Sequence, residues 1–201
     1  MRRTQQDRSS STKAALVAAA RELFTARGYH AVPAAEIVRA AGVTRGALYH
    51  HFGDKQGLFR AVIEEIEGEV TAEIGAALDG AEDPVLAMAT ALNMFLDACL
   101  REDVRQLTLA DAPAVLGWSA FRELEAEYGL GLLVDAFTRF ADAGLLVSQP
   151  LRTLAQLVLS TVMEAAHMIA EAADPAATRG EVEQVLGVWF AALLRPPPDE
   201  V

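Results

Sequence analysis

The stretch Val32–Phe59, VPAAEIVRAAGVTRGALYHHFGDKQGLF, decides the fold. It predicts a short helix ending near Ala41, a tight turn at Gly42 and a second short helix that turns Leu48 inward. Glycine suits such a turn because it adopts positive φ without a side-chain clash. The pattern predicts a helix-turn-helix unit, with the start of a further helix directly behind it.

The outward face of the second short helix has a distinctive chemistry. Arg45 and Tyr49 are four residues apart, as are Gly46 and His50, and residues four apart share a helix face. That face carries a cation, a phenol, bare backbone and an imidazole, with no carboxylate. It suits the major groove of duplex DNA and the phosphates beside it. Helical hairpins with a glycine turn also occur in all-helical proteins that bind no nucleic acid.

The distribution of charge favours the DNA interpretation. The whole chain is acidic, with net charge −11 and pI ≈ 4.8. Residues 1–60 contain ten Lys or Arg and four acids, a net +6, whereas the other 141 residues contain seven Arg and 24 acids, a net −17. A basic head on an acidic body fits an electrostatic footprint confined to one end. The basic head suits nucleic acid or an anionic membrane, and the acidic body also keeps an alanine-rich chain soluble.

The same region resembles a known family. TKAALVAAARELF at Thr12–Phe24, then Gly28-Tyr29, then AAEIVRAAGVTRGALYHHFGDKQGLF are similar, at unbroken spacing, to the N-terminal DNA-binding domain of TetR-family transcriptional regulators. The resemblance implies an all-α protein. Residues 1–58 would form a three-helix domain with the helix-turn-helix, and residues 59–201 a larger helical domain for effector binding and dimerisation.

The resemblance also implies which residues contact DNA. Thr44, Arg45 and Gly46 fall at the base-contacting start of the recognition helix, Tyr49, His50 and His51 on its phosphate- and base-contacting side, and Lys55 at the phosphate-binding start of the next helix. Arg45 can bind a guanine edge with two hydrogen bonds, worth roughly 1–3 kcal/mol of discrimination. Asp54 is a good N-cap just before Lys55. Gly46 costs about 1 kcal/mol in a helix relative to alanine, which favours close backbone approach to DNA over simple tolerance.

Val32 and Pro33 depart from the family pattern, which often has Thr or Ser here. That hydroxyl would cap the following helix and bind phosphate, and Val32 can do neither. Pro33 suits a first helical position, so we expect the helix to start there. The departure is the one feature that favours an alternative function, a helical adaptor that has lost DNA binding.

Other classes of function have little support in the sequence. It contains no Gly-rich phosphate loop, no GxSxG and no Cys–His nucleophile pattern, so we expect neither an enzyme nor a cofactor. Glu164 and His167 have the spacing of a metal-binding pair but no second pair, so we expect no metal. The single cysteine, Cys99, fits a cytoplasmic protein. The apolar region Leu154–Ala170 is interrupted by polar residues and predicts no membrane span.

The rest of the chain predicts further helices separated by Gly and Pro. The polar N-terminus, MRRTQQDRSSS, predicts a flexible arm. Helices are expected over 54–78, 84–100, up to Asp142, over 150–172 and over 178–194. Breaks are expected at Asp111, Pro113 and Gly117. Thr178 and Glu181 have the spacing of a capping box at the start of the last helix.

The last two predicted helices, about 150–172 and 178–194, are apolar on more than one side and so need burial on more than one side. The resemblance implies that they pair with their copies in a homodimer. Burial within one chain is the alternative. A dimer presents two recognition helices, so we expect a roughly palindromic operator in double-stranded DNA.

The resemblance implies a repressor that a small lipophilic effector releases from DNA. Trp118 is the best individual candidate for contacting the effector, since it lies in the broken segment. The scarcity of Lys and Arg favours a neutral or cationic molecule over an acidic one. The candidate lining residues are aromatic, Met, Leu and His side chains, a type more often found as plain core: Met88, Leu92, Phe95, Trp118, Phe121, Tyr128, Phe137, Met163 and His167.

Overall fold

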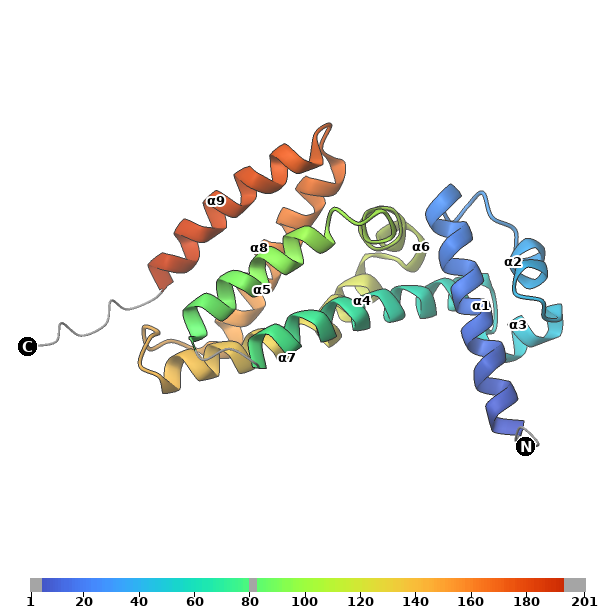
Figure 1. The fold of residues 1–201 in the computed structure, drawn as a ribbon, viewed down its shortest axis with the longest axis horizontal. Coiled ribbons are helices and arrows are strands. Elements are labelled where there is room, and N and C mark those ends of the chain that lie inside the picture. The colour runs from blue at the N-terminus through green and yellow to red at the C-terminus, as the bar shows by residue number, and fades with distance from the viewer. Residues whose placement is uncertain (1–4, 80–82, 194–201) are drawn as a thin grey trace, which may run out of the picture. The chain divides into compact units, whose positions relative to one another are not determined.

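The computed structural model describes residues 5–79 and 83–193. Over these residues the chain forms the α-helices α1 to α9 and one π-helix, η1 (Figure 1). The chain divides into two compact units. The first comprises residues 1–66 and 102–121, and the second comprises residues 67–101 and 122–201. Helices α4 and α7 therefore each begin in the first unit and end in the second.

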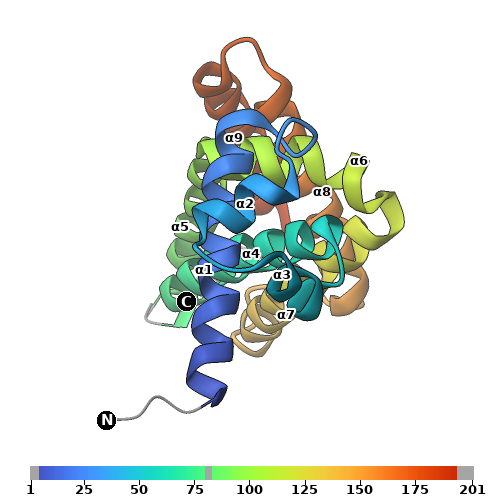
Figure 2. The same cartoon turned by 90° about the vertical axis from the view of Figure 1, so that its right-hand side faces the viewer.

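The first unit contains the predicted helix-turn-helix. Its helices are α1 (Gln5–Arg27), α2 (Ala34–Ala40), α3 (Arg45–Phe52) and the first half of α4 (Lys55–Asp79). Both α2 and α3 lie against α1 (Figures 1 and 2). Gly42, in the turn between α2 and α3, has φ 65°, the left-handed conformation that glycine adopts readily. The all-α fold and the three-helix arrangement are thus confirmed.

Apolar side chains from α1, α3 and α4 form the core of this unit. Phe24, Leu48 and Phe59 are fully buried, and the rings of Phe24 and Phe59 meet edge to face with centroids 5.5 Å apart. Val32 is also fully buried, so the position of the expected family hydroxyl belongs to the core here. Pro33 takes the N-cap position with extended backbone, and α2 begins one residue later than expected.

A distant segment of the chain completes the first unit. It contains η1 (Val104–Asp111) and α6 (Ala112–Leu116), which ends before Gly117 at φ 86°. Two side chains tie the segment to the region of α1. Arg21 Nη2 donates to Asp103 Oδ2 at 2.6 Å, and the backbone N–H of Tyr29 donates to Asp111 Oδ2 at 2.8 Å.

The second unit is a bundle made by the end of α4 and four further helices. These are α5 (Pro84–Ala98), α7 (Trp118–Asp142), α8 (Leu151–Glu171) and α9 (Pro175–Leu193). Helices α8 and α9 form a hairpin, and α5 packs against α9 (Figure 1). Arg179 on α9 donates to Asp97 Oδ1 at 2.9 Å and to Asn93 Oδ1 at 2.7 Å, which fixes α9 to α5.

Two local expectations were wrong. Part of the expected flexible arm, residues 5–11, is helical and belongs to α1, while residues 1–4 lie outside the described residues. Helix α9 begins at Pro175, because Asp174 Oδ1 accepts a hydrogen bond from the N–H of Ala177 at 3.1 Å. Thr178 therefore lies inside the helix and not at its N-cap, since Asp174 and Pro175 already supply a cap and a first-turn proline.

Helices α8 and α9 leave an apolar face uncovered. Leu157 and Met168 on α8, with Val185 and Trp189 on α9, are each more than half exposed. Burial within one chain therefore does not account for the whole apolar surface of these helices. Helix α8 is long and apolar enough to cross a membrane by length and composition, but half of its most apolar window is buried inside the structure, as in the core helix of a bundle.

Candidate nucleic-acid interface and effector cavity

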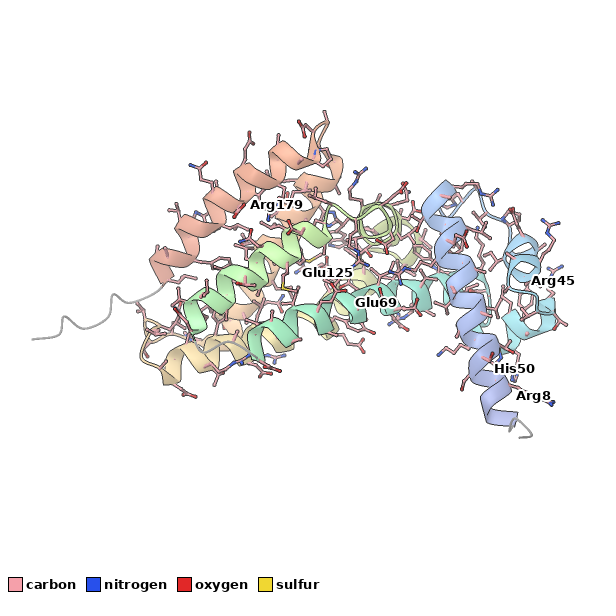
Figure 3. All side chains as sticks on the ribbon, viewed as in Figure 1. Arg8, Arg45, His50, Glu69, Glu125 and Arg179 are labelled. Atoms are coloured by element: carbon pink, nitrogen blue, oxygen red, sulfur yellow. The ribbon has the colours of Figure 1, made fainter. Side chains whose placement is uncertain are left out.

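The orientation of α3 follows from its cap and its buried residue. Thr44 Oγ1 accepts a hydrogen bond from the N–H of Ala47 at 3.3 Å and caps the helix. Leu48 is fully buried, which fixes the rotation of α3 against the core. All four residues of the predicted face are exposed: Arg45, Gly46, Tyr49 and His50. Figure 3 shows Arg45 on the side of the hairpin away from α1.

Arg45 and Tyr49 form a pair on this face. Arg45 Nη2 donates to the Tyr49 hydroxyl at 3.1 Å, and its guanidinium carbon lies 5.4 Å from the centre of the Tyr49 ring. Because a guanidinium has five N–H donors, this contact leaves others for an outside acceptor. The pair orients the guanidinium while keeping it exposed.

The remaining predicted contact residues are less exposed. His51 is half-buried, with its ring centroid 5.1 Å from that of His50. Lys55 is also half-buried. Its Nζ donates to the Tyr29 carbonyl at 2.6 Å and lies 4.0 Å from the centre of the Tyr29 ring, and burial lowers its pKa. Lys55 thus holds the chain after α1 against the start of α4. As predicted, Asp54 caps α4 by accepting from the N–H of Gly57 at 2.7 Å.

The space around the backbone differs between two glycines, one in α3 and one in α4. A Cβ on Gly57 would lie 2.0 Å from the carbonyl oxygen of Phe52, so the close approach of α3 and α4 requires glycine there. A Cβ on Gly46 would have Thr44 Oγ1, at 3.9 Å, as its nearest neighbour. The fold therefore requires Gly57, which the sequence analysis did not single out, and leaves room for a methyl group at Gly46.

The structure separates the cations of the basic head into paired and unpaired ones. Three arginines pair with carboxylates: Arg21 with Asp103, Arg27 with Glu36 and Arg60 with Glu64. Arg8, Lys13, Arg39 and Arg45 form no ion pair with a carboxylate within residues 5–79 and 83–193.

Lys13 is a candidate phosphate contact that the sequence analysis missed. Its Nζ lies 6.0 Å from the centre of the Phe52 ring, beside the end of α3, and its side chain is exposed. Nothing in the sequence distinguished it from the paired cations of the basic head.

Two neighbouring cavities lie in the second unit. One of about 680 Å³ lies between α5, α7 and α9, and one of about 100 Å³ lies among α4, α5, α7, α8 and α9. Of the predicted lining residues, Met88 and Leu92 line both cavities, Phe137 lines the larger, and Phe95 and Met163 line the smaller. Two carboxyl groups that the sequence analysis did not single out, Glu67 and Glu125, also line the smaller cavity.

The other four predicted lining residues lie elsewhere. Trp118, which is 59% exposed, and Phe121, which is buried, belong to the first unit. Tyr128 packs against Gly68 of α4, and neither it nor His167 lines these two cavities. No group of three or more His, Cys, Asp or Glu side chains that could hold a metal occurs in the part of the chain that the structure describes.

The fold and the exposed face of α3 define a helix-turn-helix protein, and comparison with known proteins agrees. A family described as "Bacterial regulatory proteins, tetR family" matches residues 16–62, and one described as "Tetracyclin repressor-like, C-terminal domain" matches residues 85–193. The chain belongs to the TetR family of DNA-binding transcriptional regulators. It is therefore a regulator and not an enzyme, as the sequence predicted.

Individual relatives support the assignment. The transposon Tn10 TetC protein of Escherichia coli is 31% identical over 127 residues, and the match spans 63% of this chain and 64% of TetC. The transcriptional repressor AcnR of Corynebacterium efficiens is 24% identical over 190 residues, which span 94% of this chain and 96% of AcnR. The crystal structure of a TetR-family regulator from Pectobacterium atrosepticum is 32% identical, with TM-score 0.87, and covers 97% of this chain and 100% of that one.

Proposed function

We propose that the protein is a cytoplasmic, homodimeric repressor that binds a roughly palindromic operator through α3 and leaves it when a small lipophilic effector binds in the second unit. One observation carries the proposal. Helix α3 buries Leu48 and exposes a cation, a phenol and an imidazole, and it contains no carboxylate.

The contacts to DNA divide by chemistry. Arg45, exposed and oriented by Tyr49, has the donors to bind a guanine edge and so to specify sequence. Thr44, Gly46, Tyr49, His50, His51 and Lys55 complete the proposed contact set, and contacts of these residues to phosphates position the helix without reading sequence. We add Lys13 to the phosphate contacts because it is an exposed cation beside the end of α3.

The uncovered face of α8 and α9 supports a homodimer. A groove of about 600 Å³ between the two helices is lined by Leu157, Met168, Val185 and Trp189, among others. Apolar side chains gathered on one exposed face mark an interaction surface. Pairing of this face with its copy would supply the second recognition helix that a palindromic operator needs.

The relative AcnR is named a repressor, which supports repression here. The apolar cavities of the second unit support release by a lipophilic molecule. Release requires that the effector binds the DNA-free state of the dimer more tightly than the DNA-bound state, and this difference in affinity is the coupling energy.

Selection of bound sequences from a random duplex DNA pool, at two salt concentrations, tests the proposal. The ligand-stripped dimer should enrich a palindrome whose binding weakens at the higher salt. Placed between a promoter and a reporter gene, that palindrome should lower transcription when the protein is present. A folded, ligand-stripped dimer that enriches no sequence would overturn the proposal.

A further inference from the structure

Glu125 of α7 is a buried carboxyl group. The residue is 4% exposed, and neither carboxylate oxygen has a hydrogen-bond partner among the described residues. The nearest cation is Arg122, whose Nη1 lies 3.6 Å from Glu125 Oε2, beyond hydrogen-bonding distance. Arg122 directs Nη2 to the Ser160 hydroxyl instead, at 3.2 Å. A buried carboxyl group without hydrogen bonds lowers the stability of the fold, and this cost favours a functional role for Glu125.

Glu125 lines the cavity of about 100 Å³ in the second unit. Glu67 of α4, which is partly buried, lines the same cavity, and Thr71 is the third polar residue there. The other lining side chains are apolar, and they include no Lys, Arg or His. Two carboxyl groups thus lie in an apolar cavity whose described lining includes no cation, and Arg122, 3.6 Å from Glu125 Oε2, lies outside that lining.

We propose that this cavity binds a small organic cation, a protonated amine on an apolar body, whose N–H groups donate to Glu125 and Glu67. The inference rests on the proposed function, because it names the chemical class of the effector. The cavity holds little more than the ammonium group and its nearest carbons. The apolar body extends past Met88, Leu92 and Phe190, which line both this cavity and the larger one of about 680 Å³.

The ionisation of the two carboxyl groups makes this binding pH-dependent. Burial raises the pKa of Glu125 to about 7, although Arg122 opposes the rise. Burial, and then the charge of Glu125, raises the pKa of Glu67 to about 7. From α5, the neighbouring Cys99 stays a neutral thiol because burial raises its pKa to about 12. Below pH 7 the cavity is therefore largely uncharged, and above pH 7 it becomes anionic.

The amine and its neutral analogue should respond differently to pH. An alkylamine, with a pKa near that of lysine, stays protonated up to pH 8, so its affinity should rise as the carboxyl groups ionise. A neutral alcohol can accept from a protonated carboxyl group or donate to an ionised one, and it carries no charge, so its affinity should change much less over the same range. Between pH 6 and pH 8 a group of pKa about 7 goes from roughly 10% to 90% ionised, so one such contact gives an increase of about tenfold.

Calorimetric titration of the full chain, without DNA, tests the inference. The probes are 2-phenylethylamine, 2-phenylethanol and phenylacetate, which share a phenyl group and differ in charge. At pH 8 the amine should bind at least tenfold more tightly than the alcohol or the acid, and it should bind more weakly at pH 6. Glu125→Gln should remove the preference for the amine, and Glu127→Gln, an exposed carboxylate two residues further on α7, should keep it.

Equal affinity for amine and alcohol, or amine affinity that falls as pH rises, would overturn the inference. The comparison of amine with alcohol and the pH dependence of amine binding both use the parent protein, so they test the inference even where Glu125→Gln fails to fold. Glu67→Gln provides a second variant. Failure of the inference is separable from failure of the proposed function. If the protein binds the amine selectively but enriches no DNA sequence, the proposed operator binding is refuted. If it binds an operator but prefers the alcohol, only the proposed cationic class of the effector is refuted.

Discussion

Residues of the DNA-binding hairpin divide between those that hold it together and those that stay exposed. Leu48 and Val32 are fully buried in the core. Arg45 contacts Tyr49, its neighbour on the exposed face. Lys55 belongs to both groups, because its ammonium holds the Tyr29 carbonyl and, with three N–H donors, keeps others for a phosphate.

Loss of Arg45 should change sequence preference. Arg45→Ala should weaken operator binding by about 1–3 kcal/mol and relax the preference at one base pair, because a bidentate contact to a base edge is lost. Binding to operator variants, each with one base pair changed, measures both effects. Equal loss of affinity for every variant would show that Arg45 contacts phosphate and not a base.

Loss of a phosphate contact should have the opposite signature. Lys13→Ala and Lys55→Ala should weaken binding to all sequences alike and lower the salt slope of log affinity by about one each. Lys55→Ala should also destabilise the first unit, since it removes the shorter of two hydrogen bonds that the Tyr29 carbonyl accepts, the other coming from the Val32 N–H at 3.4 Å, whereas Lys13→Ala should leave stability unchanged. If Arg45→Ala, Lys13→Ala and Lys55→Ala all bound as tightly as the parent, the assigned face would be wrong.

Gly46 offers a test that separates folding from binding. Gly46→Ala should stabilise the protein by up to about 1 kcal/mol, because alanine favours the helix and the added methyl group has room. The same variant should weaken operator binding if the backbone of α3 approaches DNA closely. Gly57→Ala is the matched control and should lower the melting temperature, because its Cβ would clash with Phe52. Unchanged DNA affinity of Gly46→Ala would exclude close backbone approach at this position.

At the scale of elements, η1 and α6 belong to the same unit as the DNA-binding hairpin, although they are distant in sequence. Asp111 at the end of η1 accepts from the Tyr29 backbone and from Gln106 Nε2, at 2.8 and 3.3 Å. Lys55 holds the carbonyl of the same Tyr29. Tyr29 therefore joins η1, α4 and the chain after α1 through its own backbone groups.

Asp111→Ala should destabilise the protein by about 1–3 kcal/mol, because it leaves the partly buried N–H of Tyr29 without an acceptor. Chemical denaturation measures the loss. Asp79→Ala is the control, since it removes a carboxylate that is 79% exposed from an ion pair with Arg139. Such surface pairs contribute roughly 0–1 kcal/mol. Equal losses for the two variants would refute a structural role for the Tyr29–Asp111 hydrogen bond.

At the scale of the whole molecule, helix α9 contributes to two different apolar surfaces of the second unit. Trp189, 57% exposed, lines the groove between α8 and α9 that we propose as the dimer interface. Val188, 66% exposed, lines the larger cavity with α5 and α7. Neighbouring residues of one helix thus belong to different surfaces.

This difference allows a matched test of the dimer. Trp189→Glu should convert the protein to a monomer and reduce operator affinity, because it introduces a buried, unpaired charge at the proposed interface. Val188→Glu places the same charge on the preceding residue, which lines the larger cavity, and should leave the dimer intact. Sedimentation velocity measures both. A dimeric Trp189→Glu variant, or a monomeric Val188→Glu variant, would contradict the proposed interface.

The sequence by itself determined the helix-turn-helix, the family and most helix boundaries. These features depend on local chemistry: apolar residues at helical spacing around Leu48, glycine at the Gly42 turn, and caps such as Asp54. The sequence also predicted that Arg45 and Tyr49 share one helix face, because residues four apart on a helix lie on the same side. Where local signals competed, the prediction was wrong, as at the start of α9, where Asp174 took the place of Thr178 as the cap.

Only the tertiary structure decided which charged residues are paired and which buried residues line a cavity. Arg21 and Asp103, 82 positions apart, neutralise one another, whereas Lys13 pairs with no carboxylate among the described residues. Glu125 stands between Glu123 and Glu127, which are exposed, and no feature of its sequence shows that it alone is buried. Pairing and burial depend on contacts between helices far apart in the chain, so folding itself, and not any local pattern, selects the residues available to a ligand.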